Sequence, residues 1–459
     1  MNKYLPILPE IIFFLLILAY FLIGLFYRKR QLLSVLLISI LFITSLFLFE
    51  VKGITFNGMF VADNLSQSLK LVFLLSGLLC ILISMKYEQI PDVLFYEYGL
   101  LLLLSILAMM FIVSSKDFIP LFLSVEFMSL CIYLLSGFVL FDLKSNEAAL
   151  KYYILGSFTS AIFLFGIAAL YGVTGTTSFE GVAEFLKKST NITFYYYIAS
   201  IGIITAFAFK AGCAPFHQWS PDVYEGAPTT ITAFMSVAPK AAVLGAMGRI
   251  IFEAFSPCPQ LWVGPLILVA ILTMATGNIL ALRQTNLKRL LAYSSIAHAG
   301  YVMLAVLACS YEGLLSIVFY MIVYTFMNLG AFTVILALPE GENLENYQGI
   351  SMVNLFLSLC MLAFLGSLAG IPPFGGFLAK FLVFKSVIHS GYTWVALIGI
   401  LFSVLSAYYY LRIAVKMFFI QEKGTKEIRF VIPINLKISL SVNAFCILLT
   451  GIIPSLVLI

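Results

Sequence analysis

Four ionisable residues lie inside long apolar stretches of this chain, where their side chains could exchange protons. They are Glu126, Lys210, Lys240 and Lys380. A lysine at the centre of a membrane helix costs roughly 2.5–3.5 kcal/mol on insertion scales, so such a residue is a functional candidate. Burial favours the neutral amine, which can then release and rebind a proton near neutral pH. Hard cations such as sodium prefer oxygen ligands, so these lysines favour protons as the transported ion.

Each of these residues has a plainer alternative. The carboxyl group could serve only as a structural hydrogen-bond partner, and a lysine near a helix end can extend to the membrane surface. The functional interpretation is preferred because several such costs occur in one chain. A row of titratable groups at the membrane midplane is typical of a proton conductor.

Four further residues are weaker candidates for a proton relay. They are His298, His217, Lys151 and Glu147. His298 lies within an apolar stretch, although a buried histidine is often only a core residue. His217 could equally have a loop or capping role. Glu147 and Lys151 are four residues apart with the acid first, which favours an ion pair, and a solvated surface pair is the alternative.

Two apolar stretches are interrupted by glycine and proline. Residues 211–216 read AGCAPF, and residues 369–374 read AGIPPF. Proline removes a backbone donor, and in hydrocarbon the freed groups need partners in protein or water. We therefore predict helix breaks at Gly212, Pro215, Gly370, Pro372 and Pro373.

The elements that carry these residues are membrane helices. The chain is 62% hydrophobic and 10% charged, whereas soluble domains have about 25% charged residues. With about 20 apolar residues per crossing, we predict an all-α polytopic membrane protein of about fourteen spans. The predicted spans are 8–27, 31–49, 65–85, 97–114, 118–141, 147–172, 192–213, 228–252, 262–282, 287–307, 313–337, 352–389, 393–418 and 436–458.

The two broken stretches belong to the seventh and twelfth spans. Five spans separate them, so they must run in opposite directions. This predicts two inverted five-helix repeats, spans four to eight and nine to thirteen, unless the short match is chance. The predicted division is 1–96 for the N-terminal helices, 97–252 and 262–418 for the repeats, and 436–459 for the C-terminal helix.

Basic residues predict the orientation. Those of the odd-numbered loops are Arg28, Lys29, Arg30, Lys86, Lys144, Arg283, Lys288, Arg289, Lys423, Lys426 and Arg429. The even-numbered loops and the N-terminal end hold fewer. Positively charged loops stay in the cytoplasm, so both termini are expected outside.

Cofactor signatures are absent from the sequence. The seven cysteines are far apart and form no C-x-x-C or Cys/His ligand spacing. No glycine-rich nucleotide or phosphate loop opens a helix. The net charge of +5 is spread over loops and gives no case for nucleic acid. We therefore expect no cofactor, metal or redox centre on this chain itself.

Three long motifs resemble a known family. They are FKAG (209–212) with PFHQWSPDVYEGAPT (215–229), KRLLAYSSIAHAGY (288–301) and GIPPFGGFLAKF (370–381). They are similar to the antiporter-like membrane subunits of respiratory complex I (NADH-quinone oxidoreductase), and most similar to the subunit N type. The resemblance is strong over residues 115–390, and the first three spans match only in hydropathy.

The resemblance implies a function. Partner subunits would carry NADH, FMN, iron–sulfur clusters and quinone, and would transfer the electrons. This chain would sit in the bacterial inner membrane beside other antiporter-like and small membrane subunits. It would translocate protons through Glu126, Lys210, Lys240 and Lys380, as part of a NADH:quinone oxidoreductase translocase.

Two alternatives remain at this point. A sodium/proton antiporter of similar fold, of the multisubunit type, would need no redox partner. A transporter of small solutes would need polar clusters at both breaks, and the second break offers only Gly, Pro and Phe.

Overall fold

The computed structural model describes residues 2–49, 52–189, 193–419 and 431–456, without the side chains of residues 2, 3 and 456. The basic residues Lys423, Lys426 and Arg429 lie outside these ranges. The helices are α1 (Leu8–Phe26), α2 (Arg30–Leu46), α3 (Asn64–Ser84), α4 (Phe95–Ser114), α5 (Phe118–Ser136), α6 (Leu143–Thr174), α7 (Phe179–Lys188), α8 (Phe194–Ala211), α9 (Trp219–Gly226), α10 (Thr229–Met235), α11 (Ala238–Ile250), α12 (Val263–Ala281), α13 (Leu287–Leu307), α14 (Tyr311–Ala337), α15 (Ile350–Val353), α16 (Leu355–Ala369), α17 (Gly375–His389), α18 (Thr393–Phe419) and α19 (Ile434–Ile452). A small antiparallel hairpin pairs β1 (Gly53–Thr55) with β2 (Phe60–Ala62).

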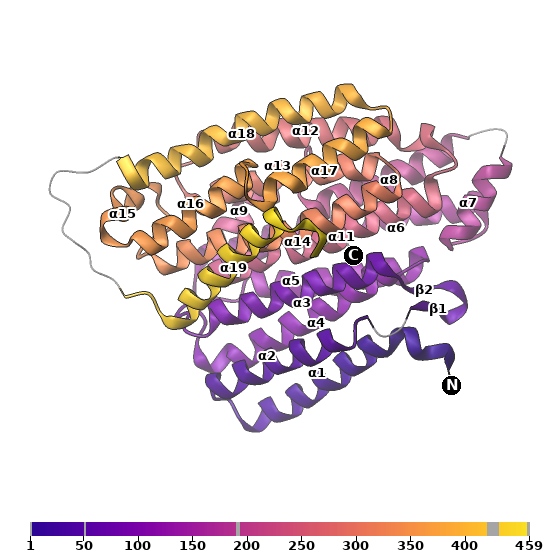
Figure 1. Ribbon diagram of the computed structural model, residues 1–459. Coiled ribbons are helices and arrows are strands. Elements are labelled where there is room, and N and C mark those ends of the chain that lie inside the picture. The colour runs from indigo at the N-terminus through magenta and orange to yellow at the C-terminus, as the bar shows by residue number, and fades with distance from the viewer. Residues whose placement is uncertain (1, 50–51, 190–192, 420–430, 457–459) are drawn as a thin grey trace.

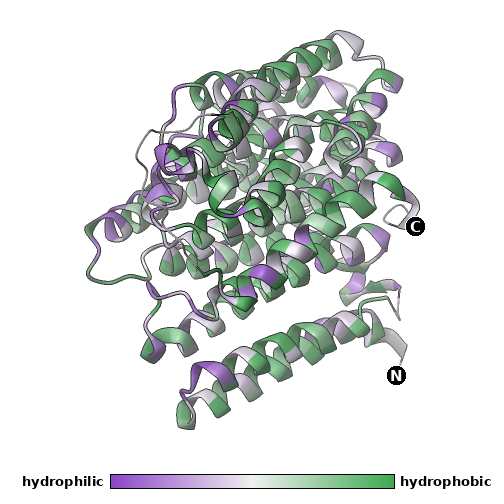
Figure 2. Ribbon diagram, turned by 60° about the vertical axis from the view of Figure 1, so that its left-hand side comes forward, coloured by the Kyte–Doolittle hydropathy of each residue, from purple (hydrophilic) through white to green (hydrophobic). Residues whose placement is uncertain are grey.

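The described residues form twelve helices that are long and apolar enough to cross a membrane. The shorter α2 and the broken pair α16–α17 raise this to the fourteen crossings predicted from the sequence. Figure 2 shows hydrophobic residues along the helices and hydrophilic ones mostly near helix ends. The all-α polytopic fold is therefore confirmed.

The two broken helices run in opposite directions. In Figure 1, α8 begins on the side of α7, and α16 begins on the opposite side, beside α15. The start of α1 and the end of α19 lie on the same side as the hairpin. We call this the even-loop side, and the face that holds the odd-numbered loops the odd-loop side.

Some boundaries differ from the predicted spans. The eighth span is two helices, α10 and α11, with a turn at Ser236 and Val237. Pro239 lies in the first turn of α11, where its missing N–H is not needed, so the helix restarts there. The hairpin and α7 lie in segments that the sequence analysis treated only as loops, because both are too short or too polar to span.

The centre of the molecule is formed by α11, α13 and α14, which are almost completely buried. Helices α12 and α13 approach each other closely at Gly277, where an added Cβ would lie 2.5 Å from the backbone nitrogen of Ala297. Small residues at such contacts are typical of membrane helix packing. Close packing here holds α13, which carries several site residues, in position.

We predict that Gly277→Ala destabilises the protein by about 1–3 kcal/mol, because the new methyl group meets backbone that cannot move aside. The midpoint of thermal unfolding in detergent should fall. Gly264→Ala is the matched control on the same helix, since a Cβ there meets no atom within 4 Å. Equal midpoints for both variants would contradict the packing argument.

Candidate proton path

The first helix break, after α8, has the geometry of a helix C-cap. Helix α8 ends at Ala211, and Gly212 adopts the left-handed conformation (φ 73°), where glycine carries no steric penalty. The carbonyl of Phe209, in the last turn, accepts from the Gly212 N–H at 2.9 Å and from the Trp219 indole at 3.0 Å, and Ala214 N–H donates to Thr273 at 2.9 Å. The break is therefore satisfied inside the protein.

Lys210, in the last turn of α8, points into a polar pocket formed by α5 and α6. Its amine donates to the Ser129 hydroxyl at 2.6 Å and to Tyr133 at 3.3 Å, and it lies 3.4 Å from the Glu126 carboxylate. These α5 residues are three and four positions apart, so they share one helix face. Ser160 of α6 donates to Glu126 at 2.5 Å. Thus the structure brings Glu126 and Lys210 together as a pair.

The partners in this pair differ in burial. The Lys210 side chain is 3% exposed and that of Glu126 is 26% exposed. A buried ammonium depends on its few hydrogen-bond partners and on the carboxylate for stabilisation. A movement of the partly exposed Glu126 side chain would therefore change the proton affinity of the buried Lys210 amine.

Lys240 lies on α11 directly after Pro239 and is 2% exposed. Its amine donates to the Ser295 hydroxyl of α13 and lies 5.6 Å from the centre of the Tyr224 ring. An added Cβ on Gly212 would be 3.5 Å from this amine. Lys240 therefore sits against the backbone of the first break.

His298 lies deeper along α13, within a group of tyrosines. Its Nδ1 is 2.5 Å from the Tyr320 hydroxyl, and its Nε2 is 3.1 Å from the Tyr410 hydroxyl. Tyr410 also bonds the Ser294 hydroxyl, next to the Ser295 partner of Lys240. The hydroxyl groups thus connect the surroundings of Lys240 to His298.

Lys380 lies on α17, after the second break, where Gly370 is also left-handed (φ 85°). Its amine donates to the Ala369 carbonyl freed by the break, at 3.0 Å, and to Ser403 at 2.9 Å. It lies 5.1 Å from the centre of the Tyr301 ring, one turn beyond His298 on α13. The polar groups therefore continue along α13 from Lys240 to Lys380.

The other three predicted relay residues lie elsewhere. His217 is half-buried beyond the first break, and its Nδ1 has no hydrogen-bond partner among the described residues. Lys151 pairs with Glu147 at 2.7 Å and with Asp222 at 2.9 Å. The side chains of Lys151 and Glu147 are both substantially exposed. This favours the alternative that they form a solvated surface ion pair.

The tyrosines, and two ion pairs outside this row that each hold at least one buried partner, were not predicted from the sequence. Glu10 and Lys70 are 2.5 Å apart and both 1% exposed. Arg249 donates to both Asp63 oxygens at 2.7 and 2.9 Å. Burial raises the pKa of Asp63, but the Arg249 guanidinium and the hydrogen bonds from Ser66 together lower it by more, so the carboxyl remains ionised at neutral pH. Glu10 could have been recognised from the sequence, because it is a charged residue within the apolar first span.

Comparison with known proteins decides the family. Residues 115–406 match the family described as NADH:quinone oxidoreductase/Mrp antiporter, TM. The chain belongs to this family.

Similar proteins show which type of subunit within this family the chain resembles. NADH-quinone oxidoreductase subunit N 1 of Thermodesulfovibrio yellowstonii is 44% identical over 396 residues, covering 86% of this chain and 85% of the relative. NADH-quinone oxidoreductase subunit N of Trichlorobacter lovleyi is 40% identical over 466 residues, covering 98% and 95%. The resemblance to the subunit N type is thus confirmed.

The fold of this family is also seen in a solved complex. A chain in the structure of respiratory complex I from Thermus thermophilus with bound aureothin matches with a TM-score of 0.84. It is 30% identical in sequence, and the match covers 98% of both chains. The family fold therefore extends over the first three spans, which contain none of the sequence motifs that resemble the family.

We predict that Glu126→Gln lowers stability more than the double change Glu126→Gln with Lys210→Met. The single change leaves a buried ammonium without a carboxylate, which costs about 1–3 kcal/mol, whereas the double change removes the ammonium as well. Thermal unfolding of the variants in detergent measures this. A double variant less stable than the single one would show that Glu126 does not stabilise a charged Lys210.

Proposed function

We propose that this chain is a proton-translocating membrane subunit of a NADH:quinone oxidoreductase. Partner subunits transfer electrons from NADH to quinone, and this chain couples that reaction to proton movement. The observation that carries the proposal is the row of three buried amines in a chain of this family, each of which donates to a serine hydroxyl of a neighbouring helix: Lys210 to Ser129 of α5, Lys240 to Ser295 of α13 and Lys380 to Ser403 of α18. No described side chain in this row offers a metal or cofactor ligand set.

The coupling step begins at the pair of Glu126 and Lys210. While the carboxylate stays 3.4 Å from the amine, it stabilises the ammonium. When it moves away, the ammonium loses that stabilisation in a low-dielectric interior, and its proton passes through water towards Lys240. Tyr410, His298 and Tyr301 then lead to Lys380, which we place on the exit side.

The free energy of a pKa change at a buried lysine is similar in size to the cost of moving a proton against the membrane potential. Moving one charge against the membrane potential costs about 2.3 kcal/mol per 100 mV. A change of one pKa unit corresponds to about 1.36 kcal/mol. Changes of one or two units at a buried lysine, caused by a neighbouring carboxylate, are therefore enough for each step.

The proposal includes partners and place. NADH, FMN, iron–sulfur clusters and quinone belong to partner subunits, and neighbouring antiporter-like and small membrane subunits flank this chain. The membrane is the bacterial inner membrane, with both termini outside. The cluster of Arg28, Arg30, Arg283, Lys288 and Arg289 on the odd-loop side supports this orientation.

We further propose that residues 97–252 and 262–418 act as the two halves of the path. The first half holds Glu126, Lys210 and Lys240, and the second holds His298 and Lys380. Residues 1–96 and 436–459 serve as flanking helices. The opposed directions of α8 and α16 support two half-paths that open to opposite sides.

We predict that Lys210→Ala abolishes proton pumping and coupled quinone reduction in membrane vesicles. NADH oxidation with an artificial acceptor should persist, because the redox subunits remain intact. Full pumping by this variant would contradict the role of Lys210. Sodium-driven pH changes by the chain reconstituted without a dehydrogenase would instead favour the antiporter alternative.

A further inference from the structure

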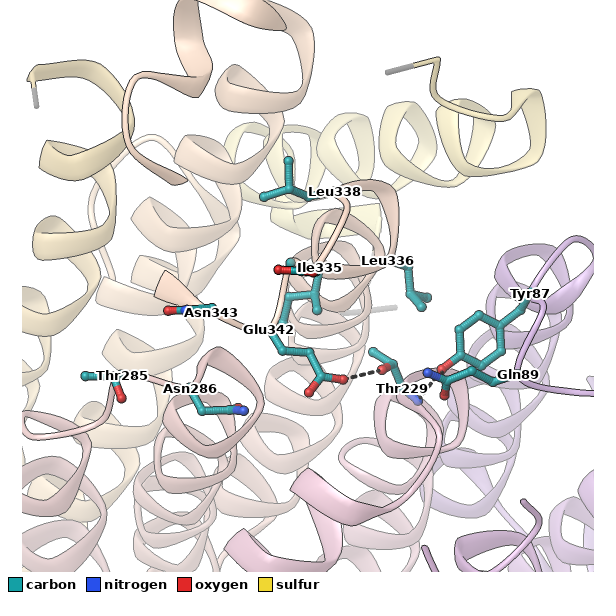
Figure 3. A pocket seen from close by; sticks show the side chains of 12 residues that line it. Tyr87, Gln89, Thr229, Thr285, Asn286, Ile335, Leu336, Leu338, Glu342 and Asn343 are labelled. Atoms are coloured by element: carbon teal, nitrogen blue, oxygen red, sulfur yellow. Dashed lines mark hydrogen bonds between the residues drawn. The ribbon is translucent and has the colours of Figure 1, made fainter. Parts of the chain in front are cut away.

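A cavity opens on the odd-loop side, away from the groups described above. Its volume is about 700 Å³, enough for roughly twenty water molecules at about 30 Å³ each. It is lined by the start of α10, the end of α14 and the loops after α3, before α13 and after α14, with residues that include Tyr87, Asn286, Ile335 and Glu342. Figure 3 shows the Glu342 carboxylate directed towards Thr229 across this cavity.

Glu342 is the group that joins the cavity to the interior. Its Oε1 accepts from the Thr229 hydroxyl at 3.4 Å and lies 3.3 Å from the Lys288 amine. Its side chain is 41% exposed, whereas that of Lys288 is 3% exposed. Lys288 also donates to the carbonyls of Glu225 and Ala227, at 2.8 and 2.7 Å. A fixed ammonium therefore stands behind a carboxylate that water can reach.

A stripe of small and polar residues leads inward from Thr229. Ala233 and Ser236 follow at steps of four and three residues, so they lie on one face of α10 and its final turn, and Lys240 comes next, in the first turn of α11. Thr229 and Ser236 are seven residues apart, about 10 Å along a helix. All four are buried. The stripe thus connects the cavity with the second amine of the row.

Helix α14 supplies the facing wall of the stripe. Asn328 donates to the Ser236 hydroxyl at 2.5 Å, while its own carbonyl oxygen has no partner among the described residues. The buried Tyr324 hydroxyl, one turn deeper, is also unpartnered there. Its ring lies 5.1 Å from that of His298. Buried polar atoms of this kind are normally satisfied by internal water.

We propose that this cavity is the intake of the proton path, with Glu342 as the first acceptor and the Thr229–Ser236 stripe as the route to Lys240. This inference rests on the proposed function and adds to it the point at which protons enter the path. The Glu342 carboxylate takes a proton from cavity water and passes it to the hydroxyl and water chain. Each hydroxyl releases one proton as it accepts another, and the neutral amine of Lys240 receives the last.

The titratable groups around Glu342 come from several elements. Lys288 faces it from α13, Tyr87 from the α3–α4 loop and Tyr347 from its own loop, and Glu340 lines the same cavity. Glu342 and Lys288 therefore form an ion pair at the wall of the cavity.

The first test is Glu342→Gln in the assembled complex, with proton pumping measured in vesicles. The expected result is a loss of roughly tenfold or more in pumping rate, because a proton-transfer group is removed. Glu342→Asp should keep most of the rate. Glu345→Gln, the same change at an exposed position of the same loop, should pump normally. Normal pumping by Glu342→Gln would overturn the proposal.

The second test separates a route from a structural ion pair. Ala233→Leu fills the stripe and leaves Glu342 and Lys288 untouched, and it should slow pumping to a similar degree in a complex that still assembles. Slow pumping by Glu342→Gln with normal pumping by Ala233→Leu would mean that the ion pair only holds the loop, which overturns the route.

Lys240→Ala distinguishes failure of the intake from failure of the proposed function. If Lys240→Ala still pumps at the full rate, the chain does not conduct protons through this row. If Lys240→Ala stops pumping while Glu342→Gln and Ala233→Leu both pump normally, only the intake is wrong.

Discussion

The backbone groups freed by the two helix breaks are the constraint on which the rest of the structure depends. In hydrocarbon each of them needs a partner within the protein or in enclosed water. At the first break the partners are the Trp219 indole and the Thr273 hydroxyl. At the second break the partner is the Lys380 amine, which donates to the Ala369 carbonyl. One break is thus completed by neutral donors, and the other by the titratable group itself.

This difference changes the meaning of the repeat. By sequence, Lys210 and Lys380 do not occupy matching positions, because Lys210 comes before its proline and Lys380 comes after its own. In space, the amine nearest Gly212 is that of Lys240, and the amine nearest Gly370 is that of Lys380, each 3.5 Å from the position of an added Cβ. The left-handed glycines therefore mark Lys240 and Lys380 as the corresponding residues. Lys210 points instead towards Glu126, so the first half holds a second buried amine, which lies 3.4 Å from a partly exposed carboxylate.

Periodicity and composition predicted the helices well because hydrocarbon thickness leaves few alternatives. The tenth span, 287–307, coincides with α13, and the broken spans were located by their glycines and prolines. The sequence also located the buried lysines, because a charge in an apolar run is easy to recognise. It could not show that Ser129, Ser295 and Ser403 are the hydroxyls that face them, since serines are common in membrane helices and their partners come from distant segments. The tyrosines around His298 were missed for the same reason.

Helix α13 carries side chains that contact both halves of the proposed path. Lys288, Ser295, His298 and Tyr301 lie along it, from the odd-loop side to the second break. Its packing against α12 at Gly277 leaves no space for a side chain, so the helix cannot shift far without separating these groups. In the proposed path, a rigid central helix with hydroxyls beside fixed amines would keep each proton transfer short. The change that drives the protons would then come from the more exposed groups, and Glu126, one quarter exposed on α5, is the row's most accessible member.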